Sequence, residues 1–461
     1  MDAHPDPAST AGPSAAPDPR AVLRSRGYLR LLILSGLIGV PVSAIAYGFL
    51  ALIDWLQEYL FTDLPGVLGF DSAPLWWPLP LLTLAGFLVA ACIRYLPGNS
   101  GHSPSEGFKA GGFPAAAELP GVALAALATL ALGAVLGPEA PLIALGGGLG
   151  ALAIRLIKKD SPPSAVAVLA SAGSFAAIST LLGSPLLGAF LLMEASGLAG
   201  AMLGIGLLPG LLAAGIGSLV FVGLDSWTGL GTFSLAIPDL PVFSTPTLAM
   251  FGWALLLGVI SPLVTWGILA VARLMRPAVH KHRLVVTPLL GLVIAALAIA
   301  FALTTGEDTA QVLFSGQSSL PALIEDGPAW PVGAVALLVI CKALAYGLSL
   351  SAFRGGPVFP AMFIGAALGI AASHLPGMAL VPAVGVGIGA MCASMLRLPL
   401  TSVLLATVLL TSDAYAVMPL VIVAVVVAHV LTGRLPEPPG RRLAGPIAGP
   451  IAGPSPGADA G

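Results

Sequence analysis

The chain has 461 residues, of which 57% are hydrophobic and only 9% are charged. Soluble domains carry roughly 25% charged residues, so this composition excludes a soluble globular protein and indicates a chain that lies in a lipid bilayer. The formal net charge of −2 indicates no nucleic-acid partner, and the three cysteines and six histidines are not spaced as metal ligands. We therefore expect no metal site, no cofactor and no catalytic residues.

Apolar runs dominate the chain between two tails. Residues 1–26 are rich in Ala, Pro, Ser and Asp, and we predict a disordered tail there; residues 436–461 are predicted as a second one. Residues 27–435 hold runs without any charge, such as Ala165–Met193 and Gly355–Leu396. Since a bilayer is crossed by about 20 apolar residues, we expect an all-α integral membrane protein with about ten to twelve embedded helices.

Loop charges predict the orientation. Positive residues gather before the first apolar run, near residue 280 and after the last run. They are Arg20, Arg24, Arg26 and Arg30; Arg273, Arg276, Lys281 and Arg283; and Arg434, Arg441 and Arg442. Positive loops stay on the cytoplasmic side, so both termini are predicted to be cytoplasmic in a plasma (inner) membrane. The loop Gly98–Pro104 is expected on the same side, one span after an external connection at Phe61–Pro78.

An internal repeat divides the chain into two related halves, about residues 27–224 and 245–435. Each half has Gly, Pro, Gly and Gly at offsets 0, 4, 9 and 13, followed by a Gly that stands twelve residues before a Pro-Leu. The residues are Gly137, Pro141, Gly146, Gly150, Gly173 and Pro185, and Gly356, Pro360, Gly365, Gly369, Gly387 and Pro399. The shared order predicts two copies of one structural unit.

The repeated segments Gly137–Gly150 and Gly356–Gly369 predict helices that begin inside apolar sequence. Gly permits tight turns and Pro is favoured in a first helical turn. A helix start has free N–H groups and a positive dipole end, which must be buried in protein or line a cavity when it lies within a membrane. Such starts favour anions, and we predict that the two share an anion pathway.

One of these helix starts carries a carboxylate and the other does not. Glu139 lies in the first, and its counterpart in the second is Val358. A carboxylate at a helix start can occupy the anion's own site, so we predict that Glu139 is a protonation-dependent gate. The alternative is a helix-capping glutamate without a transport role.

Other candidate residues have two interpretations each. Ser100, followed by Gly101, either donates its hydroxyl to an anion or caps a short helix. Val358 and Phe359 either line the pathway or pack. Glu194 is either a structural residue, which we favour, or part of a proton pathway.

Five segments together resemble motifs of the CLC family of chloride channels and proton-coupled anion antiporters, in the family's order. They are Asn99–Ser103, Gly137–Pro141, Gly183–Gly188, Gly356–Pro360 and Arg397–Thr401. The resemblance implies a divergent prokaryotic member with an inverted-repeat bundle of broken, tilted helices, assembled as a homodimer with one pore per subunit. It also implies that Ser100 coordinates the anion at the inner side and that Glu139 is the external gate.

The sequence departs from the family pattern in four places. Val358 replaces a pore-lining aromatic residue, which Phe359 follows one position later, and Pro138 replaces the gate-motif arginine. No tyrosine lies near residues 434–437, although in many members of the family a tyrosine at this place closes the inner anion site. Ala195, next to Glu194, stands where the antiporters have their internal glutamate.

The expected function is transport of a small anion, with chloride as the ligand, in a channel-like or loosely coupled manner gated by protonation of Glu139. A proton/chloride antiporter and a fluoride-selective relative remain alternatives within the family. A membrane-embedded transferase is the remaining alternative, and the lack of acid-rich metal loops and histidine clusters disfavours an enzyme. The expected partners are small anions, protons, membrane lipid and a second copy of the chain.

Overall fold

The computed structural model describes residues 19–107, 112–196, 201–229, 243, 245–410 and 414–439. Within these ranges the chain is helical and has no named β-strand. Nine helical segments there are long and apolar enough to cross a membrane, and five shorter apolar helices accompany them. The prediction of an all-α membrane protein is confirmed.

The helices divide into the two predicted halves. The first holds α1 (Pro19–Arg24), α2 (Arg26–Glu58), α3 (Leu64–Val67), α4 (Pro78–Tyr95), α5 (Leu119–Ala131), α6 (Glu139–Ile157), α7 (Pro163–Leu182), α8 (Pro185–Ser196) and α9 (Ala201–Thr228). The second holds α10 (Leu248–Lys281), α11 (Arg283–Thr305), α12 (Leu320–Glu325), α13 (Val332–Ala352), α14 (Val358–Ser373), α15 (Leu380–Leu396), α16 (Pro399–Leu409) and α17 (Ala414–Arg434).

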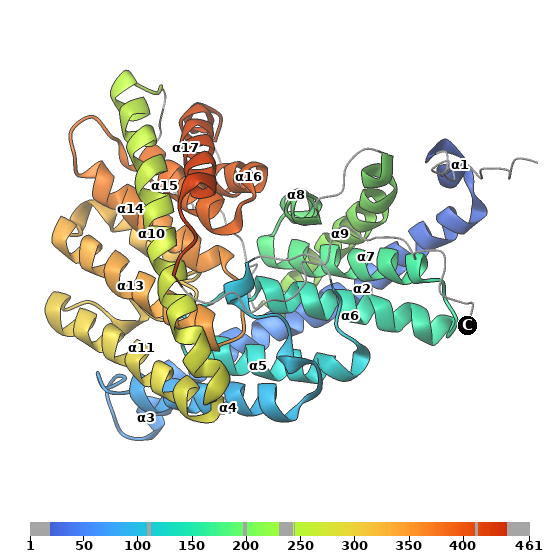
Figure 1. Cartoon of the computed structure of the whole chain (residues 1–461), viewed down its shortest axis with the longest axis horizontal. Helices are drawn as coiled ribbons and strands as arrows, with labels where there is room; N and C mark the ends of the chain where they lie inside the picture. The colour runs from blue at the N-terminus through green and yellow to red at the C-terminus, as the bar shows by residue number, and fades with distance from the viewer. Residues whose placement is uncertain are drawn as a thin grey trace, which may run out of the picture.

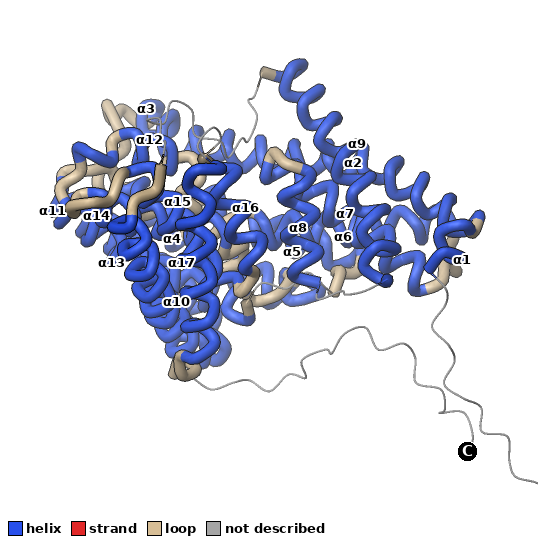
Figure 2. Tube along the Cα trace, turned by 90° about the horizontal axis from the view of Figure 1, so that it is seen from above, coloured by secondary structure: helices blue, strands red, loops and turns tan. Residues whose placement is uncertain are grey.

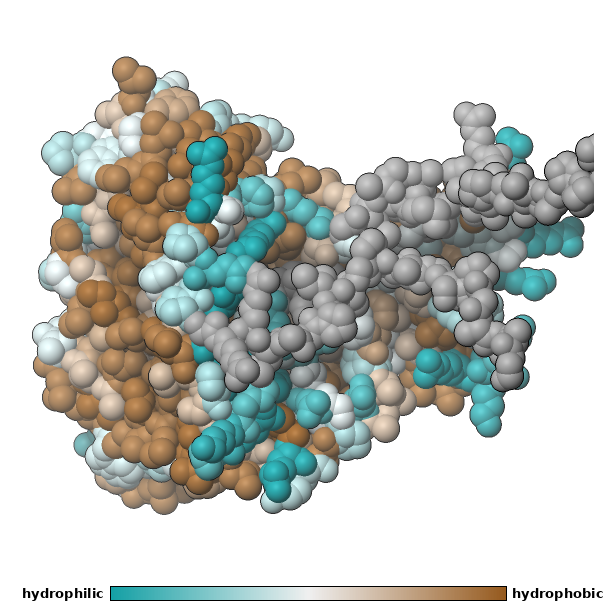
Figure 3. Space-filling model, viewed as in Figure 1, coloured by the Kyte–Doolittle hydropathy of each residue, from teal (hydrophilic) through white to brown (hydrophobic). Residues whose placement is uncertain are grey.

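Most helices of the two halves form two lobes that meet near the middle of the molecule, but α3 and α4 of the first half lie in the second lobe, near α11 (Figure 1). In one lobe α7 packs against α6 and α9, and α2 packs against α9; in the other α15 packs against α14 and α17. The view from above separates the same two groups (Figure 2). The halves also interlock, because α4 of the first packs against α11 of the second. Apolar side chains cover much of the second lobe, and hydrophilic ones gather towards the middle of this face (Figure 3).

Small residues allow equivalent helix pairs to approach closely in the two halves. A Cβ atom added to Gly146 on α6 would lie 2.5 Å from the carbonyl oxygen of Gly173 on α7, and one on Gly365 of α14 would lie 2.5 Å from that of Gly387 on α15. Neither approach leaves room for a side chain. The repeated glycines therefore mark the same helix packing twice, as in other membrane bundles.

Several apolar runs contain two helices rather than one. Ala165–Met193 holds most of α7 and α8, which separate at Gly183, a residue with φ of +62°. Gly355–Leu396 holds α14 and α15. The nine long segments and five short helices therefore exceed the ten to twelve expected. A run without charges gives the total length of embedded chain but not the position of a break.

The predicted tails are shorter than expected at their inner ends. The tail prediction is wrong for residues 19–26, because α1 begins at Pro19, a favoured residue for a first turn, and Arg26 begins α2. At the other end Trp266 and Arg273 of α10 donate hydrogen bonds to the carbonyl oxygens of Pro436 and Pro438 at 2.8 and 3.1 Å. The rest of both tails, including Arg441 and Arg442, lies outside the described residues.

Candidate functional site

The two predicted helix starts face each other. The backbone N–H of Gly137 donates to the carbonyl oxygen of Gly356 at 2.8 Å, and the N–H of Gly356 donates back at 2.5 Å. These bonds form an isolated antiparallel bridge between the halves. Helix α6 begins at Glu139 and α14 begins at Val358, each after a proline. The free N–H groups of both helices therefore open near one point inside the protein.

The carboxylate of Glu139 lies between these helix starts and is fully buried. Its Oε1 accepts a hydrogen bond at 2.8 Å from the backbone N–H of Phe359 in the first turn of α14. Its Oε2 has no hydrogen-bond partner among the described residues. A Cβ atom on Gly137 or Gly356 would collide with this carboxylate, so the two glycines provide its space.

Two titratable side chains lie close enough to Glu139 to interact with it electrostatically, Tyr346 on α13 and Cys392 on α15. Both are buried, and both are ordinarily neutral at neutral pH. The hydroxyl of Tyr346 donates to the carbonyl oxygen of Pro357 at 2.9 Å, so it supports the chain just before α14. No charged side chain of the described residues has a marked electrostatic effect on Glu139.

Ser100 lies in a backbone turn of unusual conformation between α4 and α5. Four successive residues, Gly98, Asn99, Ser100 and Gly101, have φ angles of +77°, +53°, +56° and +86°. For Asn99 and Ser100 this region is disfavoured, and such strain is concentrated at functional sites. Ser100 is 2% exposed, and its Oγ has no hydrogen-bond partner among the described residues, so it does not cap a helix.

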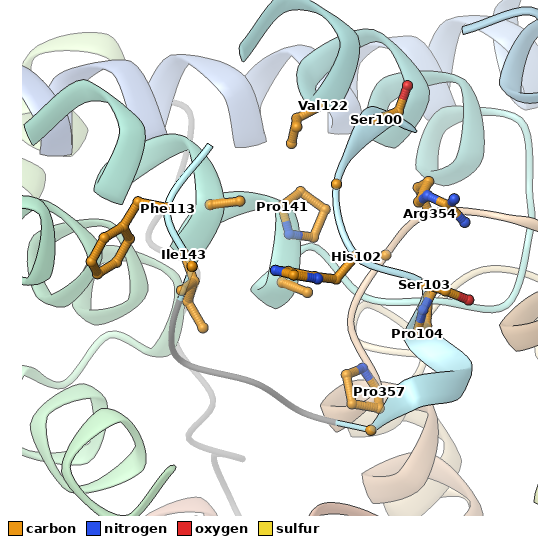
Figure 4. A pocket seen from close by; sticks show the side chains of 16 residues that line it. Ser100, His102, Ser103, Pro104, Phe113, Val122, Pro141, Ile143, Arg354 and Pro357 are labelled. Carbon is orange, nitrogen blue, oxygen red and sulfur yellow. The ribbon is translucent and has the colours of Figure 1, made fainter. Parts of the chain in front are cut away.

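A pocket connects the serine loop with the two helix starts (Figure 4). Its walls include Ser100 and Gly101, Pro141 at the start of α6, and Arg354 and Pro357 before α14. In Figure 4 Ser100 and Arg354 lie on one side of this pocket and Phe113 on the other. The structure therefore brings the serine loop into one space with both helix starts.

Three of the predicted site residues lie behind this pocket and not in its wall. The side chains of Glu139 and Val358 are fully buried and that of Phe359 is 1% exposed, and none of the three lines the pocket. Phe359 contributes through its backbone N–H, which holds Glu139.

A larger vestibule of about 660 Å³ adjoins the pocket, and the two share wall residues such as Gly101, His102 and Arg354. Arg276, His280 and Arg283 add positive or basic groups to the vestibule wall. Arg276 is paired with Glu106 at 2.6 Å. Glu106 and Glu118 also line the vestibule, so together with Arg354 its wall holds three arginines and two glutamates. The vestibule is therefore an entrance with a small excess of positive charge that leads to the serine loop.

Arg354 was not predicted as a site residue, although it lines both spaces. Its Nε and Nη2 donate to the carbonyl oxygen of Asn99 at 3.4 and 3.3 Å, and its Nη1 donates to that of Phe353 at 3.2 Å. Its backbone N–H donates to Oγ1 of Thr129 at 3.2 Å. Burial, with a smaller effect of Arg283, lowers the pKa of Arg354 to about 9, which leaves it charged at neutral pH.

A sequence signal for Arg354 did exist. It stands directly before the charge-free run Gly355–Leu396, and an isolated charge beside an embedded helix start is a functional candidate.

Glu194 lies on α8 and binds the start of α16. Its Oε1 accepts from the backbone N–H of Leu400 at 2.9 Å, and its Oε2 accepts from the backbone N–H and the hydroxyl of Thr401 at 2.7 and 2.6 Å. Both oxygens are thus engaged in capping a helix of the second half. This geometry supports the structural interpretation of Glu194.

Lys342 is a buried charge that lies apart from the pocket. Its Nζ donates to the carbonyl oxygens of Gln311, Val312 and Leu313 at 2.9, 3.2 and 3.0 Å. It also lies 4.1 Å from the ring centroid of Phe363. All three ammonium protons have acceptors, so Lys342 anchors a loop.

Comparisons with known proteins agree with this architecture. The family described as "Voltage gated chloride channel" matches residues 85–433. The chain belongs to this family. A relative named "Putative ion-transport protein YfeO" from Salmonella schwarzengrund (strain CVM19633) is 30% identical over 75% of this chain and 81% of the relative. Its counterpart from Escherichia coli (strain 55989 / EAEC) is 29% identical over 77% of this chain and 82% of that relative.

Solved structures of CLC proteins have the same fold. A slow cyanobacterial Cl−/H+ antiporter gives a TM-score of 0.70 at 19% identity, covering 89% of this chain and 96% of that one. A CLC-type fluoride/proton antiporter gives a TM-score of 0.64 at 19% identity, covering 88% of this chain and 96% of that one. A eukaryotic CLC transporter gives a TM-score of 0.66 at 18% identity, covering 88% of this chain and 72% of that one. The inverted-repeat CLC bundle expected from the sequence motifs is confirmed.

Proposed function

We propose that this protein conducts small anions, chloride among them, across the plasma (inner) membrane, passively or with loose coupling to protons, and that protonation of Glu139 opens its pathway. The observation that carries the proposal is the position of the Glu139 carboxylate. It is buried at the facing starts of α6 and α14, with one oxygen bound to Phe359 N–H and the other unpaired.

The surroundings of this carboxylate suit an anion. Two helix N-termini supply N–H groups and positive dipole ends, each contributing up to ~2 kcal/mol when partly buried. The hydroxyl of Ser100 faces no protein acceptor in the described chain. The vestibule, with its small excess of positive charge, raises the local anion concentration at the entrance. A permeant anion can therefore replace the carboxylate at the helix starts without losing its stabilisation.

Protonation sets the direction of the pH dependence. A deprotonated Glu139 is attracted to the start of α14 and competes with the anion. A protonated Glu139 is neutral, so it is no longer attracted to the helix start. Its side chain can then leave the site, and the anion binds there instead. Anion flux is therefore expected to rise as the pH falls. Tyr346 and Cys392, the titratable neighbours, remain neutral over this range.

The proposed orientation places both termini in the cytoplasm. Three segments predicted to be cytoplasmic come together in the structure. The serine loop and the connection at residues 276–283 line one vestibule, and the described chain end binds α10 through Trp266 and Arg273. Their common location supports the assignment. We further propose a homodimer with one pathway in each subunit.

Chloride efflux from proteoliposomes, measured from neutral to acidic pH, tests the proposal. The wild-type protein should conduct more chloride as the pH falls. Glu139→Gln should conduct at a high rate at every pH. An unchanged pH dependence in the variant would sink the gate assignment, and the absence of flux with chloride, nitrate and fluoride would sink anion conduction itself.

Proton-coupled antiport is the second candidate, because two of the structures with this fold are described as proton antiporters. Against it, both oxygens of Glu194 are engaged at the start of α16. An imposed chloride gradient would drive protons uphill through an antiporter. The same assay with fluoride examines the fluoride alternative. Membership of this family argues against an enzyme.

A further inference from the structure

The guanidinium group of Arg354 has donors left after its protein hydrogen bonds. An arginine carries five N–H groups, one on Nε and two on each terminal nitrogen. Nε and Nη2 each give one to Asn99, and Nη1 gives one to Phe353. One N–H on each terminal nitrogen is thus left without an acceptor in the described part of the chain. Arg354 is only 8% exposed, so these donors face the pocket and the vestibule that it lines.

The serine loop is held in register with this guanidinium. The guanidinium binds the carbonyl oxygen of Asn99, the residue next to Ser100. The left-handed backbone at both residues directs this carbonyl to Arg354. Ser100 lines the pocket too, but its Oγ is buried and has no partner among the described residues. The pocket wall therefore contains a fixed positive charge with two donors, held beside the serine loop.

We propose that Arg354 is a specificity-determining residue of the anion pathway, which selects a planar oxyanion such as nitrate over chloride in the pocket beside Ser100. Two oxygens of such an anion can accept in parallel from the terminal nitrogens. The planar guanidinium fork matches this geometry, whereas a lysine acts as a point charge. A spherical halide can accept from both nitrogens only through two bent hydrogen bonds that meet at one point, as the carbonyl oxygen of Asn99 does with Nε and Nη2. This inference rests on the proposed anion transport.

Arg283 provides a matched control. It lines the vestibule together with Arg354, but it is not a wall residue of the pocket. Loss of its charge should weaken the attraction of all anions to the entrance alike. Arg276 is a poorer control, because its substitution would also break the ion pair with Glu106.

Nitrate and chloride flux through the full-length protein in proteoliposomes test the proposal with Arg354→Lys, Arg354→Gln and Arg283→Gln. Arg354→Lys keeps the charge and loses the fork, so the nitrate-to-chloride flux ratio should fall at least about fivefold, the effect of one charge-assisted hydrogen bond. Arg354→Gln should lower the flux of both anions. Arg283→Gln should lower the nitrate flux and the chloride flux without changing the nitrate-to-chloride flux ratio.

An unchanged ratio in Arg354→Lys, or an equal change in Arg283→Gln, would overturn the proposal. Calorimetric titration of the purified wild-type protein with sodium nitrate and sodium chloride is a second test that needs no variant to fold and no flux. Tighter binding of nitrate supports the proposal, and equal or weaker binding contradicts it. Flux of neither anion would count against the proposed function alone, because the titration still decides whether the protein binds nitrate more tightly than chloride.

Discussion

Glu139 and Glu194 both lie in the first half of the chain, and each binds the start of a helix in the second half. They differ in how completely they are bound. Glu194 uses both oxygens and accepts three hydrogen bonds at the start of α16. Glu139 uses one oxygen at the start of α14 and leaves the other unpaired. A fully bound carboxylate joins two helices, whereas a half-bound one is easier to displace.

The repeat makes this comparison sharper. The counterpart of Glu139 in the second half is Val358, and that of Glu194, counted from Pro185 and Pro399, is Val408. Both acids thus belong to one half, and both helix starts that they bind belong to the other. Each contact joins a helix to its counterpart in the repeat, α6 to α14 and α8 to α16, and the two contacts differ in the number of hydrogen bonds that the acid accepts.

Charge removal should produce the largest difference between the two acids. Glu139→Gln is expected to raise chloride flux at neutral pH by about tenfold, because the neutral amide is not attracted to the α14 dipole. Glu194→Gln should leave the flux nearly unchanged. Efflux from proteoliposomes measures both, and equal effects of the two substitutions would remove the distinction.

A side chain at Gly356 should displace the gate without removing it. The added Cβ of Gly356→Ala takes the space of Glu139 Oε2, so flux at neutral pH should rise by about fivefold. Gly355→Ala is the control, because its Cβ meets Leu136 and not the carboxylate. A flux increase of the same size in the control would show that general loosening, and not gate displacement, is responsible.

Substitutions of Glu194 should lower the free energy of unfolding more than substitutions of Glu139, which is the reverse of their expected effects on flux. Glu194→Ala removes the acceptor for three donors at the start of α16, and we expect the free energy of unfolding to fall by about 1–2 kcal/mol. Thr401→Val removes only the hydroxyl donor, so it should lower the free energy of unfolding by less than Glu194→Ala does. Chemical unfolding in detergent gives these values. If Glu139→Gln destabilised the protein more than Glu194→Ala, Glu139 and not Glu194 would be the structural contact.

Tyr346 should have the smallest effect. Tyr346→Phe removes the donor to the carbonyl oxygen of Pro357, and the loss of one buried hydrogen bond is expected to cost about 0.5–1.5 kcal/mol. The pH dependence of chloride flux should persist, because Glu139 and its N–H donor remain. Unfolding and flux measurements on the same variant check both statements, and a lost pH dependence would make Tyr346 part of the gate.

The sequence predicted the facing helix starts because their requirements are local. Gly and Pro are needed where a helix begins or two backbones approach, and these residues recur at fixed offsets in the two halves. Glu139 was found because an acid within apolar sequence is conspicuous. The Gly137–Gly356 bridge confirms that the two segments meet.

The missed features depend on contacts between distant parts of the chain. Arg354 is held by Asn99 and Thr129, which precede it by 255 and 225 residues, and no local pattern specifies such contacts. The cap of Glu194 on α16 likewise joins residues more than two hundred positions apart. The side chains of Val358 and Phe359 lie outside the pocket wall, which spacing could not reveal.

The bridge between Gly137 and Gly356 has a consequence for biogenesis. During synthesis the first half enters the membrane with Glu139 in place but without α14, the helix whose N–H groups hold it. The permeation site is completed only when the second half has been inserted and the two backbones have paired. A prematurely terminated chain would therefore contain the proposed gate carboxylate but lack the second of the two helix starts that form its site.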